Sequence, residues 1–160
     1  MELDRLKTVW VKGMIGVRTV PKAGQSAISE WCAAAGFVHM PRDKANPDIL
    51  VYAAVRDPHA RFISAIAQLL RTRWNRNSLL ASLNDGQVPE PVFWPQYVYH
   101  GADTIPVLLG QWEERMGGEL RQINVSSDDQ LTEAREIGEK HWWKFAELYR
   151  PDYELLDRAS

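Results

Sequence analysis

The strongest constraint on the fold is the apolar run Asp48–Val55 (Asp-Ile-Leu-Val-Tyr-Ala-Ala-Val), which is followed at once by Arg56-Asp57-Pro58. A nearly continuous apolar run of this length is typical of a parallel strand that is covered on both faces. Asp57 suits the N-cap of a helix, and Pro58 suits its first residue. We therefore predict a buried strand that leads directly into a helix from Pro58 to about Arg73.

The rest of the chain alternates between strand and helix signals, and Ser127 with Gln130 resembles a capping box. This order favours an α/β fold with a central, mainly parallel sheet and right-handed crossovers. A length of 160 residues fits one domain spanning 1–160. The further predicted strands are Met14–Val20, Gly36–Met40, Ile105–Leu109 and Leu120–Val125, and the further helices are Ser26–Ala35, Leu79–Leu83 and Asp129–Tyr149, the last ended by Pro151.

Composition excludes several classes of partner. The formal net charge is −2, so no overall basic field favours nucleic acid. The single cysteine, Cys32, lies in an apolar helical stretch and indicates a buried thiol in a reducing compartment. Residues 1–7 mix acidic and basic side chains, and no apolar run reaches membrane-spanning length. We expect a cytoplasmic protein without a membrane span, and the sequence leaves its oligomeric state open.

A first anion-binding motif lies between the strand Met14–Val20 and the helix that follows it. The connecting turn is Pro21-Lys22-Ala23-Gly24-Gln25-Ser26. The N-terminus of a helix offers backbone N–H groups and the positive end of the helix dipole to an anion. Gly24 permits close approach, Lys22 adds a charge, and Ser26 adds a hydroxyl donor. The lysine precedes the glycine, so the motif is not a Walker A sequence. A tight turn with a surface lysine would look the same.

A second motif follows the strand Asp48–Val55. Arg56 stands at the carboxyl end of that strand, which is the edge where open α/β sheets bind ligands. Ser64 lies about two helical turns further on, so its hydroxyl and the Arg56 guanidinium can converge on an anion. The alternative is an Arg56–Asp57 pair with Ser64 facing solvent. Together the two motifs predict a ligand with two separated anionic groups.

The two motifs resemble those of PAPS-dependent sulfotransferases, of the Golgi carbohydrate type and its bacterial and viral relatives. That family carries Pro-Lys-x-Gly-x-Ser/Thr and Arg-Asp-Pro-x-x-Arg-x-x-Ser, which stand here as Pro21–Ser26 and Arg56–Ser64. Pro95-Gln96, Asn124–Ser126 and Tyr149–Leu156 resemble the family less specifically. The resemblance implies a P-loop-like, three-layer αβα fold and the nucleotide 3′-phosphoadenosine 5′-phosphosulfate (PAPS).

The resemblance also implies roles for individual residues. The 5′-phosphosulfate would be held by Lys22, Ala23, Gly24, Gln25, Ser26 and Ala27, and the 3′-phosphate by Arg56, Arg61 and Ser64. Ala27 stands where the family often has a second Ser or Thr, and the chain between the second motif and the last helix is short. Arg61 would either touch the 3′-phosphate or brace the loop. The sulfuryl acceptor would be a hydroxyl of a saccharide or small molecule, and the product 3′-phosphoadenosine 5′-phosphate (PAP). No metal is expected.

Lys22 is the expected catalytic cation, and His39 is the first candidate for the general base because it falls between the two motifs. His100 is the second candidate, while His59 is expected to be exposed and His141 to pack. The alternative interpretation of His39 is an ordinary, partly buried histidine. The alternatives for the whole chain are a catalytically reduced PAPS- or PAP-binding module, a P-loop-like nucleotide kinase or hydrolase, and a scaffold with neither activity.

Overall fold

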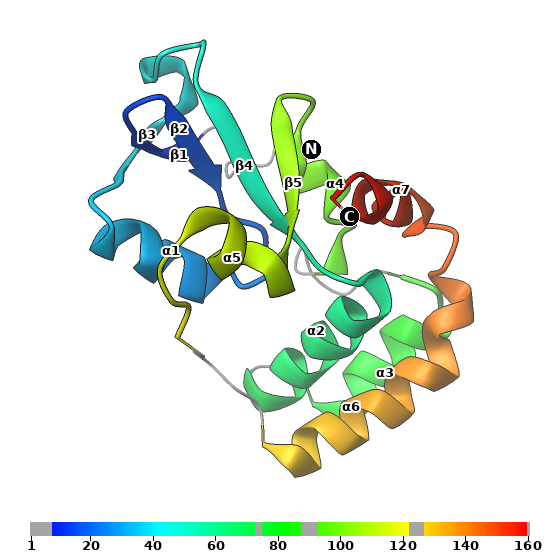
Figure 1. The fold of residues 1–160 in the computed structure, drawn as a ribbon. Coiled ribbons are helices and arrows are strands. Elements are labelled where there is room, and N and C mark those ends of the chain that lie inside the picture. Colours follow the sequence, from blue (N-terminus) through cyan, green and yellow to red (C-terminus); the bar gives the residue numbers. More distant parts are fainter. Residues whose placement is uncertain (1–7, 73–74, 88–92, 122–126, 160) are drawn as a thin grey trace.

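The structure is a computed structural model and describes residues 8–72, 75–87, 93–121 and 127–159. Its centre is a five-stranded open sheet with the strand order β3-β1-β2-β4-β5 (Figure 1). The strands are β1 (Thr8–Lys12), β2 (Ile15–Arg18), β3 (Val38–Pro41), β4 (Leu50–Val55) and β5 (Thr104–Leu108). The protein is therefore a mixed α/β fold, as the element order predicts.

The strand β4 is the inner strand that the apolar run predicts. It pairs in parallel with β2 on one side, where Val17 lies opposite Tyr52, and with β5 on the other, where Ala54 lies opposite Val107. Val51, Ala53, Ala54 and Val55 are all fully buried. The predicted strands that became β2, β3, β4 and β5 are thus present, with ends shifted by a few residues.

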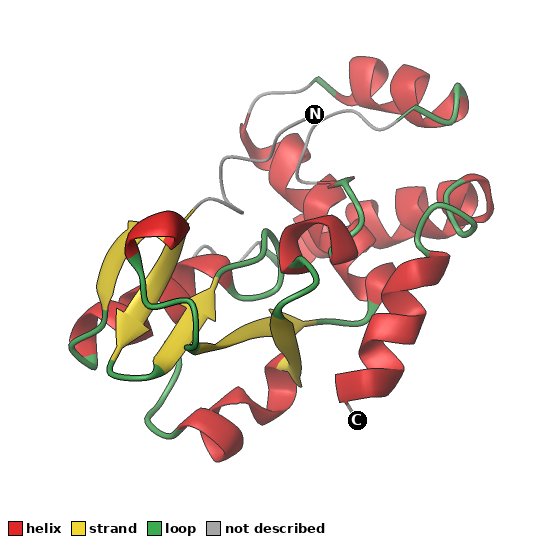
Figure 2. Ribbon diagram, turned by 90° about the horizontal axis from the view of Figure 1, so that it is seen from above, coloured by secondary structure: helices red, strands yellow, loops and turns green. Residues whose placement is uncertain are grey.

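The strand β1 is missing from the sequence prediction. It pairs antiparallel with both β2 and β3, so four strands run in one direction and β1 in the other. The sheet is therefore mixed, and β1 separates β3 from β2. The predicted strand Leu120–Val125 is wrong at Leu120 and Arg121, which are not in a strand, and its remaining residues lie outside the described chain. Figure 2 shows the strands side by side in one part of the molecule.

The described helices that pack against the sheet include α1 (Gln25–Ala34), α5 (Trp112–Met116) and α7 (Arg150–Ala159). Ile28 and Cys32 of α1 and Trp112 of α5 share one buried cluster with Val107 of β5. Leu155 and Ala159 of α7 share another cluster, which includes Leu108. Because successive strand residues point to opposite faces, Val107 and Leu108 direct these two clusters to different sides of β5.

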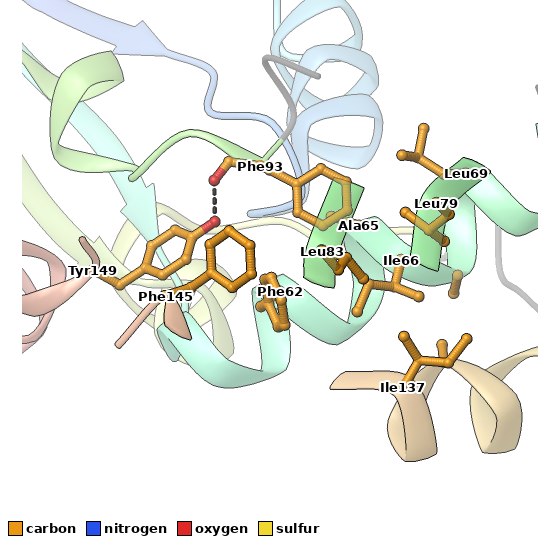
Figure 3. Close-up of a cluster of buried hydrophobic side chains, with 12 residues drawn as sticks. Phe62, Ala65, Ile66, Leu69, Leu79, Leu83, Phe93, Ile137, Phe145 and Tyr149 are labelled. Carbon is orange, nitrogen blue, oxygen red and sulfur yellow. Dashed lines mark hydrogen bonds between the residues drawn. The ribbon is translucent and has the colours of Figure 1, made fainter. Parts of the chain in front are cut away.

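A second group of helices lies beyond the carboxyl end of β4, where the chain enters α2 (Pro58–Thr72) (Figure 1). With α3 (Arg76–Asn84) and α6 (Asp128–His141), α2 encloses a core rich in aromatic side chains (Figure 3). Helix α6 approaches α2 closely at Gly138, where an added Cβ would lie 2.8 Å from Cγ1 of Ile63. The capping box of Ser127 and Gln130 begins α6, as predicted.

The predicted helix Asp129–Tyr149 is wrong in its second half. The α-helix α6 ends at His141 and is followed by a 3₁₀ turn at Trp142–Lys144. Pro151 does not end a helix but lies in the first turn of α7. A backbone N–H at this position would have no acceptor within the helix, so proline costs no hydrogen bond there. The remaining elements are the short helix α4 (Tyr97–His100) and 3₁₀ turns at Arg42–Lys44 and Leu109–Gln111.

None of the helices in the described ranges is both long enough and apolar enough to cross a membrane.

Candidate anion-binding site

The loop between β2 and α1 has an unusual backbone. Lys22 has a φ of 59° and is the only non-glycine residue with positive φ in the described chain, and Gly24 has a φ of 74°. The N–H of Ala23 donates to the carbonyl of Val20 at 3.1 Å, which closes the turn. An added Cβ at Gly24 would lie 2.6 Å from Cδ1 of Leu109. Both the positive φ and the small space therefore favour glycine at position 24.

The second motif begins where β4 ends. The Asp57 carboxylate accepts the backbone N–H of Ala60 at 2.8 Å, so it caps α2 as predicted. Among the described residues, the Arg56 guanidinium forms no ion pair with Asp57. Its Nη1 donates to the carbonyl of Lys22 at 3.3 Å. This bond joins the two motifs, which are 34 residues apart in sequence.

A cavity of about 1210 Å³ opens between the two motifs. It lies at the carboxyl ends of β4 and β5, where α/β sheets bind their ligands. Its walls come from the Lys22 loop, the start and one face of α2, and the turn after β5. The lining residues are Lys22, Gly24, Gln25, Ser26, Ala27, Val55, Arg56, Asp57, Ser64, Gln68, Arg71, Thr72, Leu108, Leu109, Gly110, Gln111, Leu120, Arg121, Leu131 and Leu156.

Positive charge dominates this cavity. Four of the described lining residues are cations, namely Lys22, Arg56, Arg71 and Arg121, and the one carboxylate among them is Asp57. Burial, together with smaller effects of the charges of Arg71, Arg56 and Arg61 in that order, lowers the pKa of Lys22 to about 8. Burial likewise lowers the pKa of Arg56, which Asp57 partly offsets. An anion placed here relieves repulsion between cations that are already assembled.

Arg71 and Gln68 are lining residues that the sequence analysis did not assign to the site. They follow Ser64 on α2 at helical spacing, so that the three side chains share the face turned toward the cavity. Arg71 has a larger effect on the pKa of Lys22 than Arg56 has. The signal in the sequence was the period of polar residues along α2, continued about two turns beyond the motif.

Arg61 of the second motif lies in the protein interior. It is 1% exposed and does not line the cavity. Its Nε donates to the carbonyl of Pro21 at 2.8 Å, and its Nη1 donates to the carbonyl of Trp94 at 2.6 Å. Of the two roles open for Arg61, the geometry is that of a brace beneath the Lys22 loop. Ala23 is also fully buried and does not line the cavity, and its N–H already donates to the carbonyl of Val20.

His39 is not brought into the large cavity. It is exposed on β3, lies against the ring of Trp10 with centroids 4.9 Å apart, and lines a separate pocket of about 260 Å³. That pocket and the cavity have Gln25 in common. His39 lies away from the Lys22 loop because β1 separates β3, which carries His39, from β2, which leads into that loop.

His100, the second candidate base, lies in the core. It is 1% exposed, its Nε2 is 3.0 Å from the carbonyl oxygen of Ala54, and burial lowers its pKa to about 4. His141 is also buried, with its ring nitrogens against the carbonyl of Ile137 and the side chain of Asn84. His59 is half-buried against Trp142, so the expectation that it is exposed is wrong.

Within the described ranges, no group of three or more His, Cys, Asp or Glu side chains is placed to hold a metal ion. Comparisons of the chain with protein-family models, with curated proteins and with solved structures found no match.

Proposed function

We propose that this protein is a sulfotransferase that transfers the sulfuryl group of PAPS to a hydroxyl acceptor. The observation that carries the proposal is that two motifs distant in sequence, Pro21–Ser26 and Arg56–Ser64, line one cavity with an excess of positive charge. A ligand with two separated anionic groups suits such a site. The proposal includes a P-loop-like, three-layer αβα class for the fold, supported by the strand–loop–helix unit at β2 and α1.

The residues fit the charges of the nucleotide. By the motif resemblance, Lys22 and Ser26 would hold the 5′-phosphosulfate, and Arg56 and Ser64 would hold the 3′-phosphate. All four line the cavity. Arg71 supplies a further cation beside Lys22. A volume of about 1210 Å³ exceeds the range of about 300–1000 Å³ common for small-molecule sites, which leaves room beside a nucleotide.

The chemistry would be in-line displacement at sulfur. The acceptor oxygen forms a bond to sulfur, the bond between sulfur and the phosphate oxygen breaks, and PAP leaves with the extra negative charge. Lys22 and Arg71 would stabilise that charge on the leaving phosphate. The acceptor proton passes to a base, for which His39 remains our candidate. Its pocket adjoins the cavity at Gln25, and a saccharide or other small hydroxyl compound would enter there.

A second candidate is a module that binds PAPS or PAP without turnover. The observation in its favour is that the described cavity lining includes no histidine, and its carboxylate, Asp57, already caps α2. A His39→Ala variant with unchanged transfer would remove His39 from the mechanism. Binding of PAP together with no transfer to a panel of saccharide and small-molecule hydroxyls would favour the module over the enzyme.

The test of the nucleotide site is calorimetric titration of the protein with PAP, with AMP and ATP·Mg²⁺ as comparators. We expect PAP to bind most tightly and the Arg56→Ala variant to lose that preference. The Arg76→Ala variant is the matched control, because Arg76 is exposed and pairs with Glu133 outside the cavity. A preference for ATP·Mg²⁺ would contradict the proposal and favour a P-loop-like kinase or hydrolase.

A further inference from the structure

The position of Arg56 depends on a side chain 40 residues away, Gln96. Val55 of β4 and Leu108 of β5 are the last paired residues of these two strands. Arg56 is therefore the first residue after β4 whose backbone has no strand partner in β5. Its N–H and carbonyl therefore need other partners if they are buried.

Gln96 supplies both partners. The N–H of Arg56 donates to Oε1 of Gln96 at 3.0 Å, and Nε2 of Gln96 donates to the carbonyl of Arg56 at 2.5 Å. One primary amide thus pairs with the backbone as a neighbouring strand would. Among side chains, only the amides of Asn and Gln offer a donor and an acceptor side by side at neutral pH. Gln96 is fully buried, so water does not replace either bond.

Gln96 is in turn fixed by Asp152 in the first turn of α7. One carboxylate oxygen accepts the N–H of Gln96 and the other accepts the N–H of Tyr97, each at 2.9 Å. Asp152 is fully buried as well. A chain of hydrogen bonds therefore runs from the C-terminal helix through Gln96 to the backbone of Arg56. From there, Nη1 of Arg56 reaches the carbonyl of Lys22 in the other motif.

We infer that Gln96 is a positioning residue for anion binding, which holds Arg56 at the cavity and is anchored by Asp152. The inference rests on the proposed function, because it assigns the geometry of the 3′-phosphate subsite. It concerns neither contact with the ligand nor a chemical step, since Gln96 does not line the cavity. The alternative is a purely structural cross-link between β4 and the segment before α4.

The test uses the Gln96→Met variant of the full chain, which keeps the length of the side chain and removes both hydrogen bonds. We expect the preference for PAP over AMP to fall about 10- to 100-fold, while AMP affinity stays within about threefold. Amide exchange at Arg56 should accelerate while that of Ala54 in β4 does not. Gln87→Met, at an exposed glutamine, is the matched control and should change neither. A structural cross-link alone would instead weaken PAP and AMP equally, and that result would overturn the inference.

Two further measurements keep the result decisive. If Gln96→Met does not fold, Asp152→Asn takes its place, because it keeps one acceptor for the two N–H groups and should give a smaller loss of the same kind.

Titration with inorganic pyrophosphate separates the two proposals. Pyrophosphate binding that needs both Arg56 and Gln96, without PAP binding, would sink the sulfotransferase proposal and support the inference. If Gln96→Met binds PAP in preference to AMP as strongly as the unaltered protein does, the inference about Gln96 is overturned and the sulfotransferase proposal stands.

Discussion

Helix α2 separates two regions of opposite character. One face carries Phe62, Ile66 and Leu69 into the aromatic core, where every contact favours folding. The other carries Ser64, Gln68 and Arg71 to the cavity, where cations repel one another. Apolar burial in the core stabilises the folded protein, whereas repulsion between the cations of the cavity destabilises it. Repulsion between cations gathered in one cavity is typical of ligand sites, because an anionic ligand reduces that repulsion when it binds.

The largest effect is expected on the core side. Phe62→Ala removes a ring that lies within 6.0 Å of the rings of Phe93, Phe145, Trp142 and Tyr149, measured between centroids. We expect a loss of about 3–5 kcal/mol in the free energy of unfolding, measured by urea denaturation. The nucleotide affinity of the molecules that remain folded should not change. A loss below about 1 kcal/mol would mean that the core is not packed as described.

Gly24→Ala should lower both the stability of the protein and its affinity for the ligand, from the cavity side alone. The added methyl meets Leu109, and an alanine at a φ of 74° is strained. We expect about 1–3 kcal/mol of destabilisation, from overpacking, together with weaker PAP binding as the loop shifts. Gly86→Ala is a matched control, because its φ of 68° carries the same strain but nothing lies within 4 Å. Equal stability losses in the two variants would contradict the close contact at Gly24.

Lys22→Gly should move stability and binding in opposite directions. It removes a desolvated charge and relieves the positive φ of Lys22, so we expect the protein to gain about 1 kcal/mol of stability. PAP affinity should fall about 10- to 100-fold with the loss of a charge-assisted bond. Denaturation and calorimetry on the same variant measure both. A variant that loses stability and keeps its affinity would reverse the comparison between core and cavity.

The smallest effect is a pH dependence set by Lys22. Its pKa is about 8 in the free protein, and a bound anion raises it, so binding takes up a proton above that pH. PAP affinity should be level just below pH 8 and fall as the pH rises above it. Calorimetry between pH 7 and about 9.5 measures this, and Lys22→Gly should remove the slope. Since the pKa of 10.5 in the unfolded chain is higher, the contribution of Lys22 to unfolding free energy rises between about pH 8 and 10.5.

Local patterns in the sequence predicted what is local in the structure. The strand β4, the cap at Asp57 and the Lys22 turn each follow from a few adjacent residues. The position of His39 could not be predicted from adjacent residues, because it depends on β1. This five-residue strand lies antiparallel between β2 and β3. The sequence left the role of Arg61 open, because the burial of this charged side chain depends on two distant carbonyls, those of Pro21 and Trp94.

The central claim is that the two motifs bind two anionic groups of one ligand, and a cycle of four affinities tests it most directly. PAP and AMP are titrated into the unaltered protein and into Arg56→Ala by calorimetry. We predict that the protein binds PAP more tightly than AMP, and that Arg56→Ala loses this preference while its AMP affinity is nearly unchanged. Equal binding of PAP and AMP by the unaltered protein, or an equal loss of both in the variant, would contradict it.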